Sequence, residues 1–470
     1  MQLKSILSKI QFWILFFFLL RLVGITNPPL EKNHNWRQAS GLMIARNFLQ
    51  VDNSILYPRK DDHKGLEGIV AIEFPLHNYL HYLVSEIFGY AHWYGRLINL
   101  IISSIGMWYF FLLIKTLFHD RLAFYSTIIL IVSIWFSFSR KMMPDTFSIS
   151  LVFMGLYHGI KYLEGYKNKH LLFYFIFATL GILAKIPAAV FLMPLAIPFF
   201  SKPVINVTKI KFVIVSFFVV AIVYWWYFVW YLHLSRTFGI WHNEGTPLLE
   251  GLKALLTHYP DTLEKFYFSA FQGFILFGCF LVGLFFAIKH QYKKLLLFGA
   301  LVFSLFVLFT LKTGNIFYCH NYYIIPFVTV MAVFAAYALT QLKKQKWLVA
   351  LVFFGCVESM ANQLYDFRIP ASEKYKLSLE EIMDKTVPKD ALIAINHRDE
   401  NHQIMYFANR KGWLIYNEEA TDSAVLNHIY SEGGKYLVID KHEPVAEQNA
   451  YATLFENDDF KVMRLEKISE

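Results

Sequence analysis

Residues 11–25 read Gln-Phe-Trp-Ile-Leu-Phe-Phe-Phe-Leu-Leu-Arg-Leu-Val-Gly-Ile, and this apolar run decides the class of the protein. A helix that crosses a membrane needs roughly 17–25 mostly apolar residues. A cleaved signal peptide is the competing interpretation, but no small-x-small cleavage site follows the run, and Arg21 lies near its outer end. We therefore expect a retained anchor, followed by a long polar loop over residues 26–92.

Further apolar runs recur along the first three quarters of the chain and bring the expected number of crossings to about eleven. Two of them are short and meet at Ile186-Pro187, so they could form a helical hairpin or one broken span, and about ten or twelve crossings are the alternatives. The runs lie near residues 93–117, 121–138, 146–163, 170–185, 187–200, 212–231, 270–289, 295–311, 322–340 and 347–364.

The composition agrees with a membrane protein. Of the 470 residues, 56% are hydrophobic, 18% are aromatic and 17% are charged, whereas soluble domains carry about 25% charged residues. This excludes a disordered chain and a typical cytosolic enzyme. The three cysteines are too few and too scattered for a disulfide framework or a zinc site.

The formal net charge of +9 is explained by membrane topology. If the N-terminus is cytoplasmic, each short inner connection carries Lys or Arg, as the positive-inside rule requires. Nucleic-acid binding is therefore an unlikely reason for the charge. The inner basic residues would be Arg121, Lys161, Lys167, Lys169, Lys202, Lys209, Lys211, Lys289, Lys293, Lys294, Lys343, Lys344 and Lys346.

The sequence divides into a membrane domain, residues 1–364, and a polar C-terminal domain, residues 365–470. In the tail, residues 390–395 and 435–440 are typical of short strands, and residues 377–385 and 423–431 of amphipathic helices. Gly433-Gly434 separates a helix from a strand. We expect a small α/β domain outside the membrane that caps the protein or docks an acceptor.

The loop over residues 26–92 is the first candidate for a site, because loops of this length in compact folds are usually functional. It places ionisable groups beside aromatic rings at the membrane surface, which suits a lipid-linked anionic substrate. The alternative is an ordinary polar loop with Trp36 at the interface. Glu73 could accept a proton or could simply favour the start of a helix, and His34 could act as a base, contact phosphate or be an ordinary loop residue.

Several cations could bind the phosphate of such a substrate. Arg37 and Arg96 carry the guanidinium fork that matches phosphate oxygens, although Arg96 could instead extend to the interface. Lys185 lies at the end of an apolar run, where a cation is costly and suggests a site.

Two further groups of residues lie at the outer ends of expected spans. Asp145 follows Pro144 and could contact substrate or start a helix; Arg140 lies near it. His320 could contact phosphate, whereas Tyr322 and Tyr323 could also be interfacial aromatic residues.

Five short motifs in this order resemble the GT-C glycosyltransferases, membrane enzymes that use polyprenyl-phosphate sugars. The similarity covers most of the membrane part, and no single motif is specific. The motifs are Glu73-Phe-Pro-Leu-His-Asn-Tyr79, Tyr94-Gly-Arg-Leu97, Ser139-Arg-Lys-Met-Met-Pro-Asp145, Gly181-Ile-Leu-Ala-Lys-Ile-Pro187, and His320-Asn-Tyr-Tyr323 followed by Pro326.

The first loop departs from the family pattern. Relatives usually begin it with an acidic residue, taken as the catalytic base, whereas this chain has Asn33-His-Asn-Trp-Arg-Gln38 and resembles a His-x-Trp-Arg-Gln subgroup. The base cannot be carried over directly, so Glu73, His34, Glu31 and Asp145 are the substitutes.

The resemblance implies a helical membrane enzyme of GT-C type that transfers a sugar from a polyprenyl-phosphate donor to a lipid, polysaccharide or protein acceptor. Catalytic candidates are Glu73, His34 and Asp145; candidates for the donor phosphate are Arg37, Arg96, Arg140, Lys185 and His320; candidates for other substrate contacts are Trp36, Gln38, His77, Tyr79, Tyr322 and Tyr323. We expect no cofactor, and a metal-independent reaction is favoured because the loop lacks a paired carboxylate cluster.

We expect the protein in a bacterial inner membrane, with its N-terminus cytoplasmic and its C-terminal domain periplasmic. A transporter or flippase for a lipid-linked glycan is the main alternative, but no internal repeat is evident and most charges lie at span ends. A membrane anchor that displays the C-terminal domain is the third interpretation.

Overall fold

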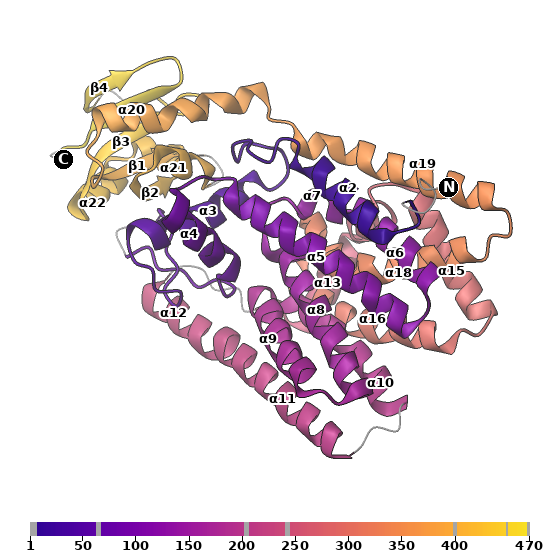
Figure 1. Cartoon of the computed structure of the whole chain (residues 1–470). Helices are drawn as coiled ribbons and strands as arrows, with labels where there is room; N and C mark the ends of the chain where they lie inside the picture. The colour runs from indigo at the N-terminus through magenta and orange to yellow at the C-terminus, as the bar shows by residue number, and fades with distance from the viewer. Residues whose placement is uncertain are drawn as a thin grey trace. The chain divides into compact units, whose positions relative to one another are not determined.

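A computed structural model describes residues 7–62, 67–201, 206–239, 245–397, 402–447 and 450–467. Internal contacts divide the chain into two compact units. The first, here called the helical unit, comprises Met1–Ile25, Arg96–Val229 and Asn243–Phe367. The second, here called the loop–sheet unit, comprises Thr26–Gly95, Trp230–His242 and Arg368–Glu470. Figure 1 shows the elements of both.

Helices form at every apolar run that the sequence analysis identified. In each run, some apolar side chains pack against neighbouring helices and the others lie on the surface of the protein. The helical unit consists of α2 (Ile10–Leu22), α5 (Tyr94–Leu117), α6 (Asp120–Val132), α7 (Trp135–Phe138), α8 (Pro144–Gly165), α9 (Asn168–Ala184), the 3₁₀ helix η1 (Ile186–Leu195), α10 (Ala196–Ser201), α11 (Asn206–Tyr224), the π-helical turn η2 (Trp225–Trp230), α13 (Leu248–Thr257), α14 (Tyr259–Glu264), η3 (Lys265–Ser269), α15 (Ile275–Lys289), α16 (Lys293–Thr313), α17 (Asn315–Cys319), η4 (Asn321–Ile324), α18 (Ile325–Thr340), α19 (Gln345–Gln363) and η5 (Leu364–Phe367).

The chain is a multi-pass membrane protein. Within the described residues, five helical segments are long and apolar enough to cross a bilayer: Tyr94–Leu117, Asn206–Phe238, Lys293–Thr313, Asn321–Thr340 and Gln345–Phe367. Shorter apolar helices are Ile10–Leu22, Asn168–Ala184, Ile186–Phe200 and Ile275–Lys289. The count of about eleven crossings therefore stays a prediction.

Helices α8 and α9 form an antiparallel pair in which small residues let the two backbones approach closely (Figure 1). A Cβ atom added at Gly155 would lie 2.8 Å from the amide nitrogen of Ala178. One added at Gly181 would lie 2.8 Å from the carbonyl oxygen of Ser148. This packing brings the first turn of α8 beside the last turn of α9.

The loop–sheet unit combines helices of the long first loop with a mixed five-stranded sheet in the order β2-β1-β3-β5-β4. Strands β2, β1 and β3 are parallel, and β5 and β4 follow antiparallel. Its elements are α3 (Asn35–Gln50), α4 (Leu76–Phe88), α12 (Tyr231–Phe238), η6 (Ala371–Ser378), α20 (Leu379–Thr386), β1 (Leu392–Asn396), α21 (Gln403–Ala408), β2 (Lys411–Ile415), η7 (Glu418–Thr421), α22 (Ser423–Ser431), β3 (Gly434–Asp440), β4 (Ala452–Glu456) and β5 (Phe460–Arg464).

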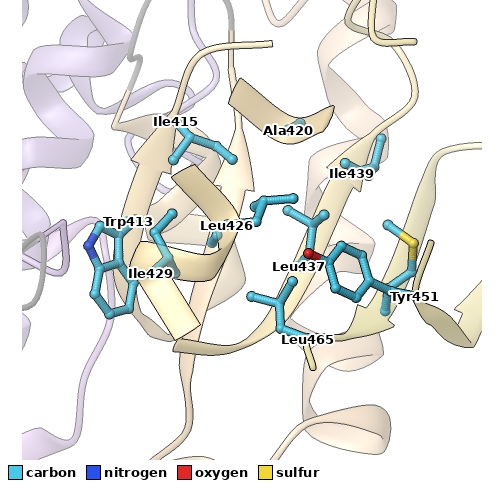
Figure 2. Close-up of a cluster of buried hydrophobic side chains, with 11 residues drawn as sticks. Trp413, Ile415, Ala420, Leu426, Ile429, Leu437, Ile439, Tyr451 and Leu465 are labelled. Atoms are coloured by element: carbon cyan, nitrogen blue, oxygen red, sulfur yellow. The ribbon is translucent and has the colours of Figure 1, made fainter. Parts of the chain in front are cut away.

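Helix α22 covers one face of this sheet. Its residues Leu426 and Ile429 pack against Trp413, Leu437 and other buried apolar side chains of the strands (Figure 2). Strands β1 and β3 and helices α20 and α22 confirm the predicted α/β character of the tail. Strands β2, β4 and β5 were not predicted.

Gly412 in β2 has no room for a side chain. Its φ is +147°, and an added Cβ atom would lie 1.9 Å from the carbonyl oxygen of Ile393 on β1. We expect Gly412→Ala to destabilise the loop–sheet unit by about 1–3 kcal/mol, the usual cost of overpacking, seen as a lower midpoint of thermal unfolding in detergent. Gly165→Ala, where the added atom meets nothing within 4 Å, should leave the midpoint unchanged; equal effects would contradict the steric explanation.

Candidate functional site

Asp145 and Lys185 form an ion pair within the helical unit. Asp145 lies in the first turn of α8, where the helix dipole favours a carboxylate. Lys185 follows the last residue of α9 and adopts an extended conformation, with φ −162° and ψ 117°, which breaks the helix before Pro187. The Lys185 Nζ atom lies 2.5 Å from Asp145 Oδ1.

Aromatic rings surround the ammonium group of Lys185. Its Nζ atom lies 4.6 Å from the ring centroid of Tyr322 and 5.5 Å from that of Tyr323, distances at which the π faces attract a cation. The His320 ring stacks against Tyr322 with centroids 5.3 Å apart. The structure thus brings together five residues that the sequence analysis selected from three separate motifs.

A pocket of about 220 Å³, counting its solvent-open part, lies beside this pair and is lined by Asp145, Lys185, Phe309, Tyr322, Tyr323 and Pro326 among others. The Oδ2 atom of Asp145 is buried and has no hydrogen-bond partner among the described residues. Buried carboxylate oxygens are normally satisfied. This oxygen is therefore an acceptor beside the pocket that none of the described residues engages.

Arg140 lies elsewhere in the helical unit. Its Nη1 and Nη2 atoms donate to the carbonyl oxygens of Val23 at 2.5 Å and Gly24 at 2.7 Å, and its guanidinium covers Phe367 at 4.5 Å from the ring centroid. These contacts tie the segment before α8 to the end of α2. Arg96 is buried in the first turn of α5. Phosphate contacts by either residue stay a prediction.

A second cluster lies in the loop–sheet unit, where Arg37 of α3 forms an ion pair with Glu73. Ile72 and Phe74 flank this carboxylate in the sequence, and the structure adds a cationic partner. Just before α3, Asn33 and His34 both have positive φ values, 60° and 61°. Consecutive left-handed residues other than glycine are uncommon and tend to occur at functional sites.

Lys60 belongs to the same cluster and was missed by the sequence analysis. Burial, together with the charge of Arg37, lowers the pKa of Lys60 to about 8, although the carboxylates of Asp62 and Glu73 act in the opposite direction. The signal available in the sequence was the charged run Arg59-Lys-Asp-Asp62, which follows a proline.

If Lys60 binds the donor phosphate, its titration should appear in the donor KM. The ammonium is charged below pH 8 and loses its proton above it, so we expect KM to rise roughly tenfold or more between pH 7.5 and 9.5, the worth of one charge-assisted hydrogen bond. Lys60→Arg should abolish the rise, because arginine stays protonated, and Lys60→Met should give a high KM at every pH. A wild-type KM that is flat over this range would contradict the assignment.

The remaining candidates of the first loop lie mainly in its packed core. His77 is buried and its Nε2 atom lies 2.8 Å from the carbonyl oxygen of Gly95; burial lowers the pKa of His77 to about 4. Tyr79 packs edge-on against Phe48. Gln38 is fully buried and Trp36 is partly buried in the first turn of α3. Substrate contacts by these residues stay predictions.

Glu31, the other candidate acid, is buried and accepts a hydrogen bond from Asn27 at 2.9 Å. Across the part of the chain that the structure describes, no group of three or more His, Cys, Asp or Glu residues is placed to hold a metal ion. The described residues therefore show no clustered ligand set of the kind that hard cations prefer.

Part of the membrane region is similar in sequence to a known family. Residues 73–228 match the family model described as dolichyl-phosphate-mannose-protein mannosyltransferase. No curated protein matches the chain by sequence.

The fold is similar to solved structures over nearly the whole chain. ArnT from Cupriavidus metallidurans in the apo state has a TM-score of 0.62 and 12% identity, covering 96% of this chain and 97% of its own. The same enzyme bound to undecaprenyl phosphate has a TM-score of 0.59 and 11% identity, covering 96% and 98%. The oligosaccharyltransferase AglB from Archaeoglobus fulgidus, in complex with an inhibitory peptide and a dolichol-phosphate, has a TM-score of 0.56 and 13% identity, covering 92% and 70%. This likeness shows that the chain has the GT-C fold, and the family match lies inside its membrane part.

Proposed function

We propose that the protein transfers a sugar from a polyprenyl-monophosphate donor to a lipid, polysaccharide or protein acceptor at the outer face of a bacterial inner membrane. The observation that carries this proposal is the Asp145–Lys185 pair beside a pocket, with one buried carboxylate oxygen that no described residue engages. Solved relatives of the same fold bind undecaprenyl phosphate and dolichol-phosphate, which supports a polyprenyl-phosphate donor.

In the proposed reaction, an acceptor hydroxyl or amine attacks the anomeric carbon of the donor sugar. The bond from that carbon to the phosphate oxygen breaks, and polyprenyl phosphate leaves with the bonding electrons. A carboxylate takes the proton of the acceptor, and Asp145 is the preferred base because its Oδ2 atom has no partner among the described residues. A single displacement of this kind would invert the anomeric centre. Glu73 and His34 are the alternative bases.

Cations stabilise the charge that grows on the departing phosphate. Within the helical unit we assign this role to Lys185, held against Asp145 and the Tyr322 ring. Within the loop–sheet unit, Arg37 and Lys60 are the candidate phosphate ligands. His320, stacked on Tyr322, would supply a hydrogen bond to a phosphate oxygen. The His-x-Trp-Arg-Gln pattern of the first loop is proposed as the mark of its subgroup.

We further propose the membrane orientation predicted from the charges of the short loops. The N-terminus would be cytoplasmic, the first loop and residues 365–470 would be periplasmic, and residues 1–364 would be the catalytic membrane domain.

The proposal is tested with purified protein in detergent and radiolabelled polyprenyl-phosphate sugars supplied one at a time with an envelope extract as acceptor. We expect at least one donor to be consumed and free polyprenyl phosphate to be released. If none of a panel of hexosyl and pentosyl donors is consumed by folded protein, the proposal is rejected.

A further inference from the structure

Arg46, near the end of α3, lies in a buried network within the loop–sheet unit. Its Nη2 atom donates to Asp61 Oδ2 at 2.6 Å, and both terminal nitrogens lie 3.2 Å from the carbonyl oxygen of Tyr406 in α21. The side chains of Arg46 and Asp61 are each only 5% exposed. The guanidinium also lies 4.7 Å from the Tyr406 ring centroid. One arginine of α3 thus contacts both the first-loop segment at Asp61 and α21, the helix between strands β1 and β2.

Asp61 is held from two further directions. Its Oδ1 atom accepts a hydrogen bond from Asn47 Nδ2 at 2.8 Å. Its backbone carbonyl accepts one from the amide of Gly412 at 3.0 Å. The next residue, Asp62, forms a parallel bridge with Gly412 and accepts a hydrogen bond from the amide of Leu414 at 3.2 Å. The segment at residues 61–62 therefore continues the sheet at the edge of β2.

The same two elements carry the charged cluster of the first loop. Lys60 directly precedes Asp61, and Arg37 lies on α3, the helix that carries Arg46 and Asn47. The chain between Asp61 and Lys60 is a single peptide link, so any movement of Asp61 moves Lys60. The contacts of Arg46 with Tyr406, and of Asp61 with Gly412, thus hold both α3 and the segment with Lys60 against the C-terminal sheet. They set the position of that segment relative to α3.

We propose that Arg46 and Asp61 are positioning residues through which the C-terminal sheet holds Arg37 and Lys60 in their geometry for the donor phosphate. This inference rests on the proposed function and extends it, because it makes the C-terminal segment part of the donor-binding machinery. A lysine at position 46 would keep the charge but lacks the planar fork that reaches Asp61 and the Tyr406 carbonyl together.

The test uses the full chain with Arg46→Met, Arg46→Lys and Tyr406→Leu. Tyr406→Leu removes the ring over Arg46 and the hydroxyl that contacts Tyr90, without altering a charge, so it tests the ring contact if Arg46→Met folds poorly. Lys441→Met is the control, because Lys441 also forms an ion pair in the loop–sheet unit, with Glu456 at 3.1 Å, and donates to the carbonyl oxygen of Asn457, so that its contacts lie within the C-terminal domain. Each variant is measured for kcat, donor KM, the pH midpoint of KM and hydrogen exchange.

Arg46→Met is expected to raise the donor KM at least tenfold with a smaller change in kcat, and to move the pH midpoint of KM upward from about 8 toward the ordinary lysine value of about 10.4. Arg46→Lys should recover part of both effects. Loss of folded protein alone would lower the active fraction without moving KM or the midpoint.

Hydrogen exchange makes the test independent of activity. Amides of residues 35–41 and 57–61 should exchange faster in Arg46→Met and Tyr406→Leu and remain protected in Lys441→Met. Unchanged exchange there, or equal changes in the control, would overturn the positioning role. If the wild-type protein consumes no donor, the proposed function fails, while the exchange data still decide whether the sheet holds this cluster.

Discussion

Asp145→Asn is expected to lower kcat for sugar transfer by roughly 10²–10⁴-fold, the contribution of a well-placed general base. The amide keeps the shape of the side chain but cannot take a proton from the acceptor. It also leaves Lys185 without the carboxylate that lies 2.5 Å from its Nζ atom. The measurement is the single-turnover rate of donor consumption at saturating donor and acceptor.

Asp120→Asn provides the matched control for this substitution. Asp120 also lies in the first turn of a helix, α6, and pairs with Lys115 at 3.0 Å, but its side chain is largely exposed. We expect its kcat to stay within twofold of the wild type, since exposed pairs contribute about 0–1 kcal/mol. An Asp145→Asn variant that is folded and retains wild-type kcat would remove Asp145 as the base.

Arg37→Met is expected to weaken donor use strongly. A hydrogen bond to a charged group contributes about 1.5–3 kcal/mol, so loss of the guanidinium should lower kcat/KM by roughly 10–150-fold. Initial rates over a range of donor concentrations measure this change. Arg37→Lys should recover only part of it, because an ammonium cannot contact two phosphate oxygens in the same planar fork.

Glu73→Gln separates the two roles proposed around this ion pair. If Glu73 only holds Arg37, the variant should keep most of its kcat and show a modest rise in donor KM. If Glu73 is the base, the variant should lose kcat as fully as Asp145→Asn.

The Arg37 prediction has its own contradicting outcome. Arg37→Met with an unchanged kcat/KM would show that the guanidinium does not contact the donor.

The apolar runs predicted the helices because length and hydrophobicity determine where a chain can cross a bilayer. They did not predict the type of helix. The run near residues 187–200 begins as a 3₁₀ helix with Pro187 at its start and Pro194 inside it. The run near residues 121–138 is interrupted after Val132, where Ser133 has left the helix. The 3₁₀ conformation and the helix break both depend on local backbone geometry, which cannot be predicted from the hydrophobicity of the sequence.

Individual site residues were selected from the sequence, but their pairing was not. Asp145 and Lys185 are 40 positions apart, and they meet because glycines allow α8 and α9 to pack closely. Lys60 was missed because a lysine in a charged run is normally solvated, and only the folded loop buries it near Arg37. The contacts between the first loop and β2 could not be predicted either, since a backbone hydrogen bond between Gly412 and Asp61, residues far apart in the sequence, leaves no local pattern.

The most direct test of the central claim follows the sugar itself in sealed proteoliposomes that contain the purified protein, a labelled polyprenyl-phosphate sugar and an acceptor extract. The account predicts that label passes from donor to acceptor with one polyprenyl phosphate released for each sugar transferred, and that Asp145→Asn blocks this transfer. Label that crosses the bilayer on an intact donor, with no polyprenyl phosphate released, would contradict it and indicate a transporter.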